Sequence, residues 1–557
     1  MKLGVISLGC DKATVDSERL VGELVGHGAV VTPDLPAADV ILVNTCGFID
    51  AAKQESIDAM LEASKLKTTA SVKAVVAVGC LVQRYKHELQ TEIPEVDLFL
   101  GFSELHHLVP ELAKRGLIED PVASHPGVRQ FLGEKSHVRY LKISEGCDHT
   151  CAFCAIPLMR GKHRSEPLAR LVHEAQQLEA QGAKEINLVA QDLGHWGRDL
   201  GLGGPKLPDL LEKLLRETTV PWFRLLYVYS AGINERLVDV MARESRIVPY
   251  IDMPVQHATD RMLERMRRPE RVRTLREKLA WLRGAIPDLA IRTTCLVGFP
   301  GETDEEFRAL LAFLEEAQFD RMGAFAYSPQ EGTRAMQYED DVDDGVKRDR
   351  LEEIVEVQRA ISGERLARFV GRDVDVLVDR LEEEEGIKVG RVQWQADDVD
   401  GVTYLEQGGW AQPGGFVRAR IIASEDYDFQ ALLGFLEEAQ FDRMGAFAYS
   451  PQEGTRAMQY QDDVDDAVKR DRLEEIVEVQ RAISAERLAR FVGRDVDVLV
   501  DRLEEEEGIK VGRVQWQADD VDGVTYLEQG GWAQPGGFVR ARITASEDYD
   551  FQAAALT

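Results

Sequence analysis

The chain has 557 residues, of which 44% are hydrophobic and 30% charged, with 67 Lys and Arg against 98 Asp and Glu. The formal charge of -31 argues against a general nucleic-acid binder or a membrane-surface protein, because both kinds of partner are themselves acidic. The apolar content suffices for several buried cores, which excludes global disorder, and the length corresponds to three or four domains. No apolar run has the roughly 18 residues of a membrane span, and the N-terminus lacks a signal-peptide pattern, so we expect a cytoplasmic protein.

The first 118 residues alternate short apolar runs with helical patterns. The runs LGVISLG, DVILVNT, VKAVVAVG and VDLFLG predict strands, and helices are expected from about Val15, Ala51 and Gln83. Continuous apolar strands separated by helices indicate a parallel α/β sheet covered on both faces. The stretch 119–136 contains Pro and Gly, and we expect a linker there.

Residues 137–371 show a second alternation of strands and helices. Its apolar runs include EINLVAQ, WFRLLYVY, YIDMPVQ, AIRTTCLVGF and MGAFAYS. That regularity predicts a (βα) barrel or half-barrel. Residues 348–371 then have a strongly helical composition and end in Gly371, a plausible C-cap of an exit helix.

From Ala309 onward the chain repeats itself at an offset of 122 residues. Only five of the 123 aligned positions differ, namely Ala312/Gly434, Glu339/Gln461, Gly345/Ala467, Gly363/Ala485 and Ile422/Thr544. Near identity over this length favours one recent tandem duplication over a solenoid array, with an assembly or cloning artefact as the alternative. Residues 1–308 carry a net charge of -4, residues 309–430 carry -14 and residues 431–552 carry -13, so the acidity belongs to the repeated tail.

Each copy ends in a pattern of short strands separated by Gly-rich turns, at 372–430 and again at 494–553. RDVDVLVDRL alternates valines with charged residues, and IKVGRVQW, VTYLEQGGW and FVRARIIASE follow it. Two small five-stranded antiparallel barrels are therefore expected. Residues 431–493 duplicate the last strand and exit helix of the central barrel, which can use only one copy. We expect the first copy, continuous with the helix from about Thr303, to close it.

The strongest chemical signal is GCDHTCAFC, in which Cys147, Cys151 and Cys154 form a C-x3-C-x2-C motif after the strand-like YLKIS. Three thiolates at this spacing can hold three corners of a 4Fe-4S cube and leave the fourth iron open. A structural zinc ion needs a fourth ligand, and neither His149 nor His163 lies at a usual spacing for one.

A second, dispersed triplet consists of Cys10, Cys46 and Cys80, which follow the apolar runs VISLG, ILVNT and VVAVG. Since the carboxyl ends of parallel strands lie on one edge of a sheet, the three thiols can converge there as ligands. The alternative is that all three are buried structural cysteines, which their shared position after a strand disfavours. Cys295 lies inside TTCLVGF without a partner and is expected to be a packed core thiol.

Weaker candidates lie at other strand ends. Gly298, Gly301 and Glu302 in LVGFPGET are candidate contacts of a nucleotide cofactor, because glycines let a backbone approach a nucleotide, although a strand-to-helix turn capped by Thr303 explains them equally well. Gln191, which closes INLVAQ, is a candidate cofactor or substrate contact together with Asp192, with a capping role as the alternative.

These features together resemble the methylthiotransferase family of the radical S-adenosylmethionine (SAM) superfamily. SLGCDKATVDSERLVGEL, NTCGFIDAAKQESIDAML, SEGCDHTCAFCAIPLMRGKHRS, AQDLGHWG and PYIDMPVQHATDRMLERMRRPE are closely similar to members that modify an aspartate of a ribosomal protein. The similarity covers residues 1 to about 430, and removal of one repeat unit leaves 435 residues in the family's three-part order.

The resemblance implies an auxiliary 4Fe-4S cluster on Cys10, Cys46 and Cys80, a SAM-cleaving 4Fe-4S cluster on the C-x3-C-x2-C motif, and a C-terminal TRAM domain. It implies an enzyme that adds a methylthio group to the β-carbon of an aspartate in ribosomal protein S-twelve, with two SAM molecules and with electron and sulfur donors of unknown identity. Radical chemistry is needed in any case, since a methylene hydrogen beside a carboxylate is too weakly acidic for an ordinary general base.

Two alternatives stay open. A sister family methylthiolates a tRNA adenosine, and nine Arg or Lys against four acids in residues 260–283 favour it locally. A non-catalytic iron-sulfur or zinc protein with an acidic interaction tail is the other. The acidic tail itself suits docking to a basic ribosomal protein better than docking to RNA.

Overall fold

The computed structural model describes residues 1–118, 128–381, 388–406, 411–433, 442–444, 446, 466–503, 510–518, 523–529, 532, 534–547 and 549–556. These residues divide into two compact units, Met1–Leu432 and Leu433–Thr557, and each is described by itself. None of the helices in the described ranges is long and apolar enough to cross a membrane.

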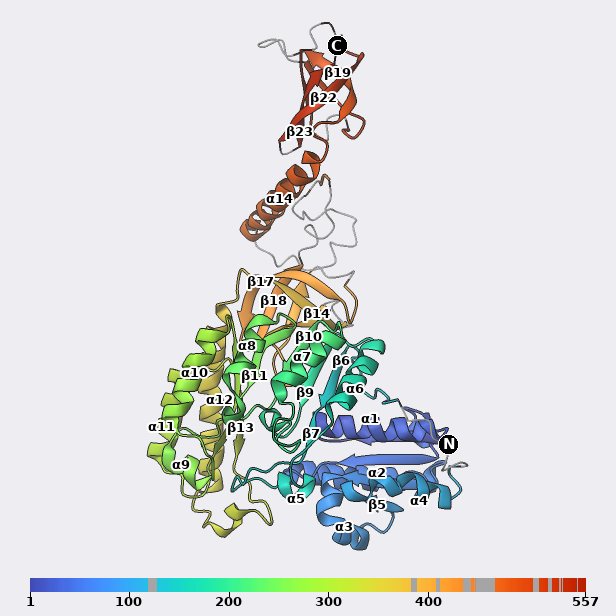
Figure 1. Ribbon diagram of the computed structural model, residues 1–557, viewed down its shortest axis with the longest axis vertical. Helices are drawn as coiled ribbons and strands as arrows, with labels where there is room; N and C mark the ends of the chain where they lie inside the picture. Colours follow the sequence, from blue (N-terminus) through green and yellow to red (C-terminus); the bar gives the residue numbers. More distant parts are fainter. Residues whose placement is uncertain are drawn as a thin grey trace. The chain divides into compact units, whose positions relative to one another are not determined.

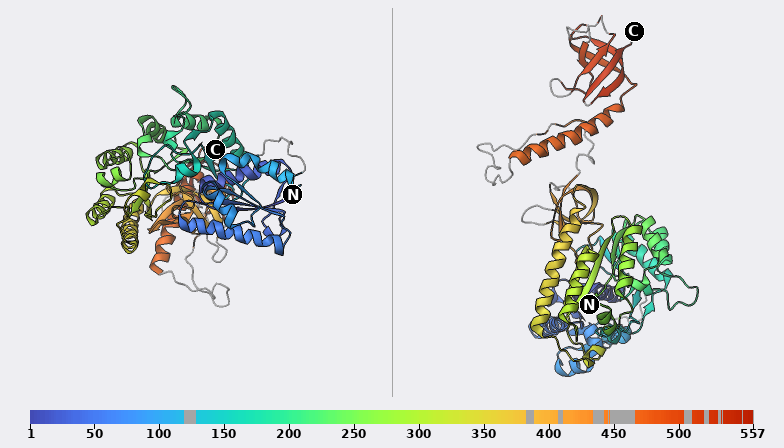
Figure 2. Two further views of the ribbon diagram at one scale, coloured as in Figure 1. Left: turned by 90° about the horizontal axis from the view of Figure 1, so that it is seen from below. Right: turned by 90° about the vertical axis from the view of Figure 1, so that its left-hand side faces the viewer.

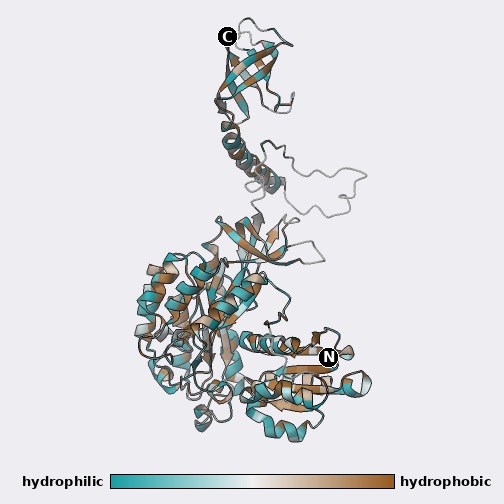
Figure 3. Ribbon diagram, turned by 45° about the vertical axis from the view of Figure 1, so that its right-hand side comes forward, coloured by the Kyte–Doolittle hydropathy of each residue, from teal (hydrophilic) through white to brown (hydrophobic). Residues whose placement is uncertain are grey.

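The N-terminal residues form a five-stranded parallel sheet, here called the N-terminal sheet, in the order β2-β1-β3-β4-β5. The strands are β1 (Lys2–Ser7), β2 (Val30–Val31), β3 (Val40–Thr45), β4 (Ala74–Gly79) and β5 (Leu98–Leu100), and the helices are α1 (Asp11–Gly26), η1 (Leu35–Ala37), α2 (Asp50–Thr69), α3 (Cys80–Glu92), η2 (Phe102–His107) and α4 (Leu108–Lys114). Alternate residues of β3 and β4 fill two cores, one with α1 and α4 and the other with α2 and α3. The covered parallel sheet that the apolar runs predict is confirmed (Figures 1 and 3).

The second region forms a six-stranded parallel sheet, here called the central sheet, in the order β13-β12-β11-β10-β9-β6. Its strands are β6 (Val138–Lys142), β9 (Glu185–Val189), β10 (Trp222–Leu225), β11 (Ile247–Asp252), β12 (Ala290–Val297) and β13 (Arg321–Ala326), beside the short pair β7 (Ser144–Glu145) and β8 (Arg164–Ser165). Its helices are α5 (Ile156–Arg160), α6 (Leu168–Ala180), α7 (Leu207–Glu217), α8 (Glu235–Arg243), α9 (Asp260–Arg265), α10 (Val272–Ala285), α11 (Asp304–Ala317) and α12 (Asp344–Ala367), with short 3-10 turns η3 (Leu193–His195), η4 (Ser230–Gly232) and η5 (Arg334–Gln337). The sheet is a half-barrel, because β6 and β13 form its two edges.

The first copy of the repeat supplies the edge strand β13, which pairs in parallel with β12 over six residues. Helix α12 then packs against β13 and α11 and continues toward the first small barrel (Figure 2). In the second copy, the expected strand at 441–457 lies outside the described residues except for Asp442, Arg443, Met444 and Ala446. The second copy of the exit helix is α14 (Asp466–Ala489).

The expected linker at 119–136 is anchored in the part that the structure describes. Arg129 is 5% exposed, and its guanidinium pairs with Glu18 of α1 at 2.5 Å and with Glu174 of α6 at 3.0 Å. Paired charges that are this well buried hold a segment in one place, because separating them leaves an uncompensated charge. This segment therefore ties the N-terminal sheet to the central sheet; residues 119–127 lie outside the described residues.

Each copy ends in a closed five-stranded barrel, as the strand pattern predicts. The first barrel consists of β14 (Asp373–Leu381), β15 (Lys388–Val392), β16 (Thr403–Glu406), β17 (Phe416–Glu425) and β18 (Asp428–Leu433), and the second of β19 (Asp495–Leu503), β20 (Lys510–Arg513), β21 (Thr525–Glu528), β22 (Phe538–Glu547) and β23 (Asp550–Ala555). The barrels differ from the expected antiparallel form in one respect, since β16 pairs with β18 in parallel, and β21 with β23. The fifth strand of each barrel therefore lies between the third and the fourth strands.

The first barrel docks on the amino-terminal edge of the central sheet through buried charges. Arg391 of β15 is 1% exposed and pairs with Glu185 of β9 at 2.7 Å and with Asp379 of β14 at 2.6 Å. Arg224 of β10 binds the other oxygen of the Glu185 carboxylate at 2.8 Å. Because all of these groups are removed from water, each depends on its partners.

The second barrel carries the same residues in a different environment. Phe416 of the first barrel packs on Trp222 of β10 with a ring separation of 4.8 Å, whereas the equivalent Phe538 is 70% exposed. The equivalent of Arg391 is Arg513, whose side chain is 26% exposed and pairs with Asp501 at 3.4 Å. The duplicated residue is thus a built-in control for the docked one.

We expect Arg391→Met to lower the free energy of unfolding of the first unit by about 3–5 kcal/mol, because it leaves Glu185 and Asp379 buried without their shared cation. The matched change Arg513→Met should cost less than about 1 kcal/mol, as exposed pairs do. Urea denaturation of the two variants checks this, and equal losses would show that the buried pairs do not hold the first barrel.

Candidate functional site

The dispersed cysteines lie together at the carboxyl edge of the N-terminal sheet, after the adjacent strands β1, β3 and β4. Cys46 and Cys80 follow their strands directly, and the backbone at Gly9 packs against the Cys46 side chain. Gly79 has φ +103°, and a Cβ there would lie 2.5 Å from the Thr45 carbonyl oxygen, so only glycine fits this turn. The sequence thereby brings the three thiols to one edge.

Burial and mutual proximity determine the state of these thiols. Burial raises the pKa of Cys80 to about 11 and also raises that of Cys46, and a charge on Cys10 would raise both further. The Arg160 guanidinium opposes the rise at Cys80. Of the three, Cys80 is buried, Cys46 is half-buried and Cys10 is exposed. Metal ligation needs thiolates, so a bound cation or cluster is the natural partner for thiols that converge in this way.

The second triplet lies in the cluster loop, residues 146–155, between β7 and α5. Gly146 has φ +74°, and a Cβ there would lie 2.2 Å from the Lys162 carbonyl oxygen. The loop is held farther along by the Ala152 N–H, which donates to the Met266 carbonyl oxygen at 2.9 Å. Burial raises the pKa of Cys147 to about 11 and of Cys154 to about 12.

The two triplets meet at one interface within the first unit. Cys80 belongs to a small apolar cluster with Ala155 and Met159, which directly follow the second triplet. Arg160, at the end of the same helix, pairs with Asp16 of α1 at 2.9 Å and with Glu145 at 3.0 Å. The carboxyl edges of the two sheets therefore face each other with both cysteine sets between them.

The spacing of the sulfurs distinguishes the possible occupants. A zinc ion would hold tetrahedral thiolates about 3.8 Å apart, given Zn–S bonds of about 2.3 Å. Within the described ranges, no three cysteine sulfurs lie within 4.8 Å of one another. Neither cysteine set therefore has the spacing of a single zinc site, and a 4Fe-4S cube, which binds each thiolate on a different iron, takes thiolates that lie farther apart.

Side chains that the motif did not indicate fix the cluster loop. The Tyr229 hydroxyl lies 2.8 Å from Cys151 Sγ, and the His149 ring stacks on Tyr229 at 3.8 Å. The Arg268 guanidinium covers the Tyr229 ring at 3.8 Å and lies 3.9 Å from Cys151 Sγ. Tyr229 follows β10 by four residues and Arg268 follows α9, and no spacing along the chain indicates that the two side chains meet at Cys151.

His149, Asp192 and His195 form a polar cluster with metal-ligand spacing, since their ligand atoms lie within 4.8 Å of one another. His149 Nε2 lies 2.8 Å from the Asp192 carboxylate. Arg198 donates to His195 Nε2 at 2.6 Å, so that lone pair is already used. Burial lowers the pKa of His195 to about 4, which keeps it neutral. The cluster is therefore a hydrogen-bonded support of the loop, with Asp192 also capping η3.

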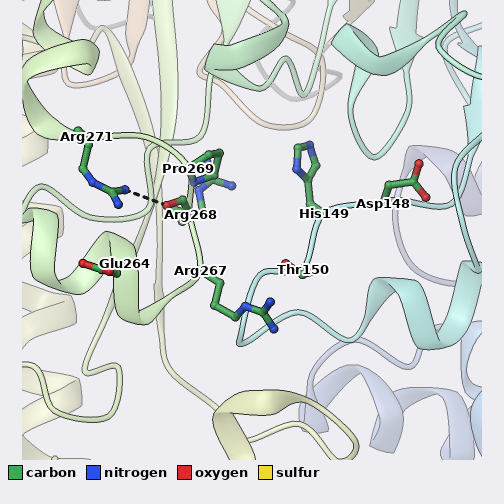
Figure 4. A pocket seen from close by; sticks show the side chains of 8 residues that line it. All are labelled: Asp148, His149, Thr150, Glu264, Arg267, Arg268, Pro269 and Arg271. Atoms are coloured by element: carbon green, nitrogen blue, oxygen red, sulfur yellow. Dashed lines mark hydrogen bonds between the residues drawn. The ribbon is translucent and has the colours of Figure 1, made fainter.

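A cleft of about 460 Å³ borders the cluster loop (Figure 4). It is lined by Asp148, His149, Thr150, Glu264, Arg267, Arg268, Pro269 and Arg271. Arg268 is 3% exposed and committed to its loop contacts, whereas Arg267 is exposed and adopts φ +58°. The cleft gives the loop an opening to solvent with a positive rim.

The remaining candidates lie at separate strand ends. Gln191 follows β9, and both polar atoms of its amide are buried without a hydrogen-bond partner in the described structure. The space over Gly298 is filled by the Lys347 side chain, and that over Gly301 by Arg265, while Glu302 accepts a hydrogen bond from the Phe299 N–H at 3.1 Å. Gln191 and one carboxylate oxygen of Glu302, Oε1, have unused hydrogen-bonding capacity in the described structure, while the two glycines belong to a strand-to-helix turn. Their roles as SAM contacts stay predictions.

Cys295 lies inside β12 and is 0% exposed within the core of the central sheet, where burial raises its pKa to about 12. It belongs to neither triplet.

Comparison with known proteins covers the same three parts of the chain. Residues 2–101 match the uncharacterized protein family UPF0004, residues 141–314 match the radical SAM superfamily, and residues 370–433 and 492–556 each match the TRAM domain. A solved structure, the radical SAM methyltransferase TsrM from Kitasatospora setae, is similar with a TM-score of 0.47 and 13% identity over 65% of this chain and 89% of that one.

Two curated relatives are similar over most of their length. A protein from Anaeromyxobacter sp. (strain Fw109-5) is 46% identical over 76% of this chain and 91% of its own, and one from Aquifex aeolicus (strain VF5) is 42% identical over 77% and 96%. Both are named ribosomal protein uS12 methylthiotransferase RimO. With two cysteine triplets, a central half-barrel and terminal TRAM barrels in that order, the chain belongs to the RimO family of radical SAM methylthiotransferases.

Proposed function

We propose that this enzyme adds a methylthio group to the β-carbon of an aspartate side chain in ribosomal protein S-twelve, using two 4Fe-4S clusters and two SAM molecules. The observation that carries the proposal is the meeting of both cysteine triplets at one interface. One substrate side chain can then reach a hydrogen-abstracting site and a sulfur-donating site in turn. The relatives' name supports ribosomal protein S-twelve as the substrate.

Cys147, Cys151 and Cys154 hold the SAM-cleaving cluster in this proposal. A cluster at this site, with SAM bound, supplies the one-electron chemistry that removes a hydrogen atom from an unactivated C–H bond. Tyr229 and Arg268 direct polar hydrogens toward Cys151, which stabilises negative charge on its sulfur. The His149 ring keeps Tyr229 in place by stacking on it.

Cys10, Cys46 and Cys80 hold the auxiliary cluster. Arg160 places a positive charge beside Cys80, which favours the thiolate form of that cysteine and opposes the effect of burial on its pKa. Asp16 and Glu145 fix that guanidinium from both sides of the interface. Arg160 thereby couples the auxiliary site to the loop that holds the other triplet.

Gln191 is proposed as a SAM contact because its buried amide has no other partner. Gly298, Gly301 and Glu302 are proposed with it as backbone contacts on the same sheet edge, but their packing against Lys347 and Arg265 makes them the weaker part of the set.

The rival substrate is a tRNA adenosine, which the basic residues at 260–283 favoured. The structure pairs several of these cations with carboxylates. Arg261 binds Glu306 at 2.5 Å, Arg273 binds Glu277, and Arg276 binds Glu316. Paired cations attract phosphates less, so this segment supports RNA binding less than its composition suggests.

The test uses the iron- and sulfide-reconstituted full chain under anaerobic conditions, with SAM and a chemical reductant. One reaction contains an S-twelve loop peptide with its aspartate, and the other a tRNA anticodon stem-loop. We expect methylthio addition to the peptide alone, measured by mass spectrometry. Addition to the RNA alone would assign the protein to the tRNA-modifying activity.

A further inference from the structure

Lys12 is a buried cation without an anion. It is the second residue of α1 and is 8% exposed, and its ammonium lies 3.5 Å from the centre of the Tyr227 ring, which follows β10 of the central sheet. Of the carboxylates that the structure describes, none lies within 4.0 Å of this ammonium, and no hydrogen bond to it is formed. The ring face is its one close partner in the described structure.

This placement is costly for a lysine. Removing an ammonium from water is unfavourable, and a cation–π contact offsets only part of that loss of hydration. A cation in the first turn of a helix also faces the positive end of the helix dipole. Nearby buried cations are paired, since Lys142 and Arg160 both bind Asp16 and Glu145. The contrast indicates that Lys12 is placed to meet an anion from outside the chain.

The surroundings define where that anion would lie. Lys12 follows Cys10 by two residues, and the Tyr227 hydroxyl lies in the field of Cys10 and donates to Asp11 at 3.4 Å. Tyr227 adopts φ +67°, and its N–H donates to Asp252 at 3.3 Å, so an unusual backbone conformation holds the ring under the ammonium. The ammonium therefore lies between the auxiliary triplet and the carboxyl edge of the central sheet.

We propose that Lys12 binds the side-chain carboxylate of the substrate aspartate, an inference that rests on the proposed function. The carboxylate carbon is bonded directly to the β-carbon. An ammonium–carboxylate contact here thus holds the reacting carbon beside the auxiliary triplet and within the interface that both cysteine sets share. It also selects an acidic side chain over an amide of the same shape, because an amide leaves the buried charge uncompensated.

The test measures binding of two S-twelve loop peptides, one with the target aspartate and one with asparagine, to the cluster-loaded full chain in the presence of SAM. We expect the wild type to prefer the aspartate peptide by about 10- to 100-fold, the value of one charge-assisted contact. Lys12→Met keeps the length of the side chain and should reduce the preference to about 1. Lys12→Arg keeps the charge and should retain most of it.

The matched control is Lys53→Met in the same region. The Lys53 ammonium also lies over a tyrosine ring, at 5.7 Å from that of Tyr85, but it has a carboxylate partner, Asp50, at 2.7 Å. The Lys53→Met variant should leave the preference for the aspartate peptide unchanged. Iron content per chain is measured for every variant, and a value equal to that of the wild type separates a loss of recognition from a failure to assemble.

Two results would overturn the inference. A Lys12→Met protein that kept the aspartate preference while losing SAM affinity would assign the carboxylate to SAM instead of the substrate. A Lys12→Met protein that kept both the aspartate preference and the SAM affinity would show that Lys12 binds neither carboxylate. A wild-type enzyme that modified neither peptide would refute the proposed function itself, and the inference with it; peptide modification by the wild type isolates the Lys12 question.

Discussion

A Cys46→Ala protein is expected to cleave SAM and to form no methylthiolated peptide, a loss of product of more than about 1,000-fold, because the cofactor that supplies the sulfur has lost a ligand. Cys46 lies in the N-terminal sheet, whose two cores are separate from that of the central sheet. The radical-generating half should therefore remain assembled. Mass spectrometry of the peptide and chromatography of 5'-deoxyadenosine measure the two activities in one reaction.

The matched control is Cys295→Ala, which removes a buried thiol that belongs to neither triplet. Both activities should persist, and bound iron should stay at about eight ions per chain, against about four for Cys46→Ala. Methylthiolated peptide from the Cys46→Ala protein would contradict the assignment of this triplet.

Replacement of Cys151 by alanine is expected to abolish SAM cleavage, again by more than about 1,000-fold, and with it every later step. Cys151 is the member of its triplet that Tyr229 and Arg268 both contact. Cys147→Ala and Cys154→Ala should behave alike, since three thiolates leave one iron open and two do not hold the cube in place. The assay is 5'-deoxyadenosine formation with reductant and without peptide.

A Tyr229→Phe protein tests the support of Cys151 by its neighbours without removing the cysteine ligand itself. It keeps the ring that His149 and Arg268 stack on and removes the hydroxyl at Cys151 Sγ. The Tyr229→Phe protein should retain its iron and cleave SAM more slowly.

Normal 5'-deoxyadenosine formation in the Cys151→Ala protein would show that this triplet does not hold the SAM-cleaving cluster.

Much of the fold could be predicted because its signals are local. Continuous apolar runs identified β3 and β4 as strands buried on both faces, and alternating valines identified β14. Helix α1 begins at Asp11, four residues before the expected start, because the cysteine-bearing turn leads directly into it. Periodicity does not detect such a start, since the first turn carries little apolar pattern.

The non-local contacts could not be predicted. Strand ends indicated that the dispersed cysteines converge, and motif spacing indicated the same for the other triplet. No spacing along the chain indicates that Cys80 packs against Ala155, which directly follows the second triplet. Lys12 lies before the expected helix start at about Val15, and no local pattern indicates that it packs on Tyr227, which lies more than 200 residues later. The parallel pairing of β16 with β18 likewise depends on barrel closure, which pattern alone does not specify.

The most direct test of the central claim is a reaction with an S-twelve loop peptide deuterated at the β-carbon of its aspartate. The account predicts that, with the wild-type protein, deuterium appears in 5'-deoxyadenosine and the same peptide gains a methylthio group. With the Cys46→Ala protein, deuterium should still appear in 5'-deoxyadenosine, but no methylthiolated peptide should form. A methylthiolated peptide with no deuterium transferred, or deuterium transfer that requires Cys46, would contradict the division of labour between the two cysteine triplets.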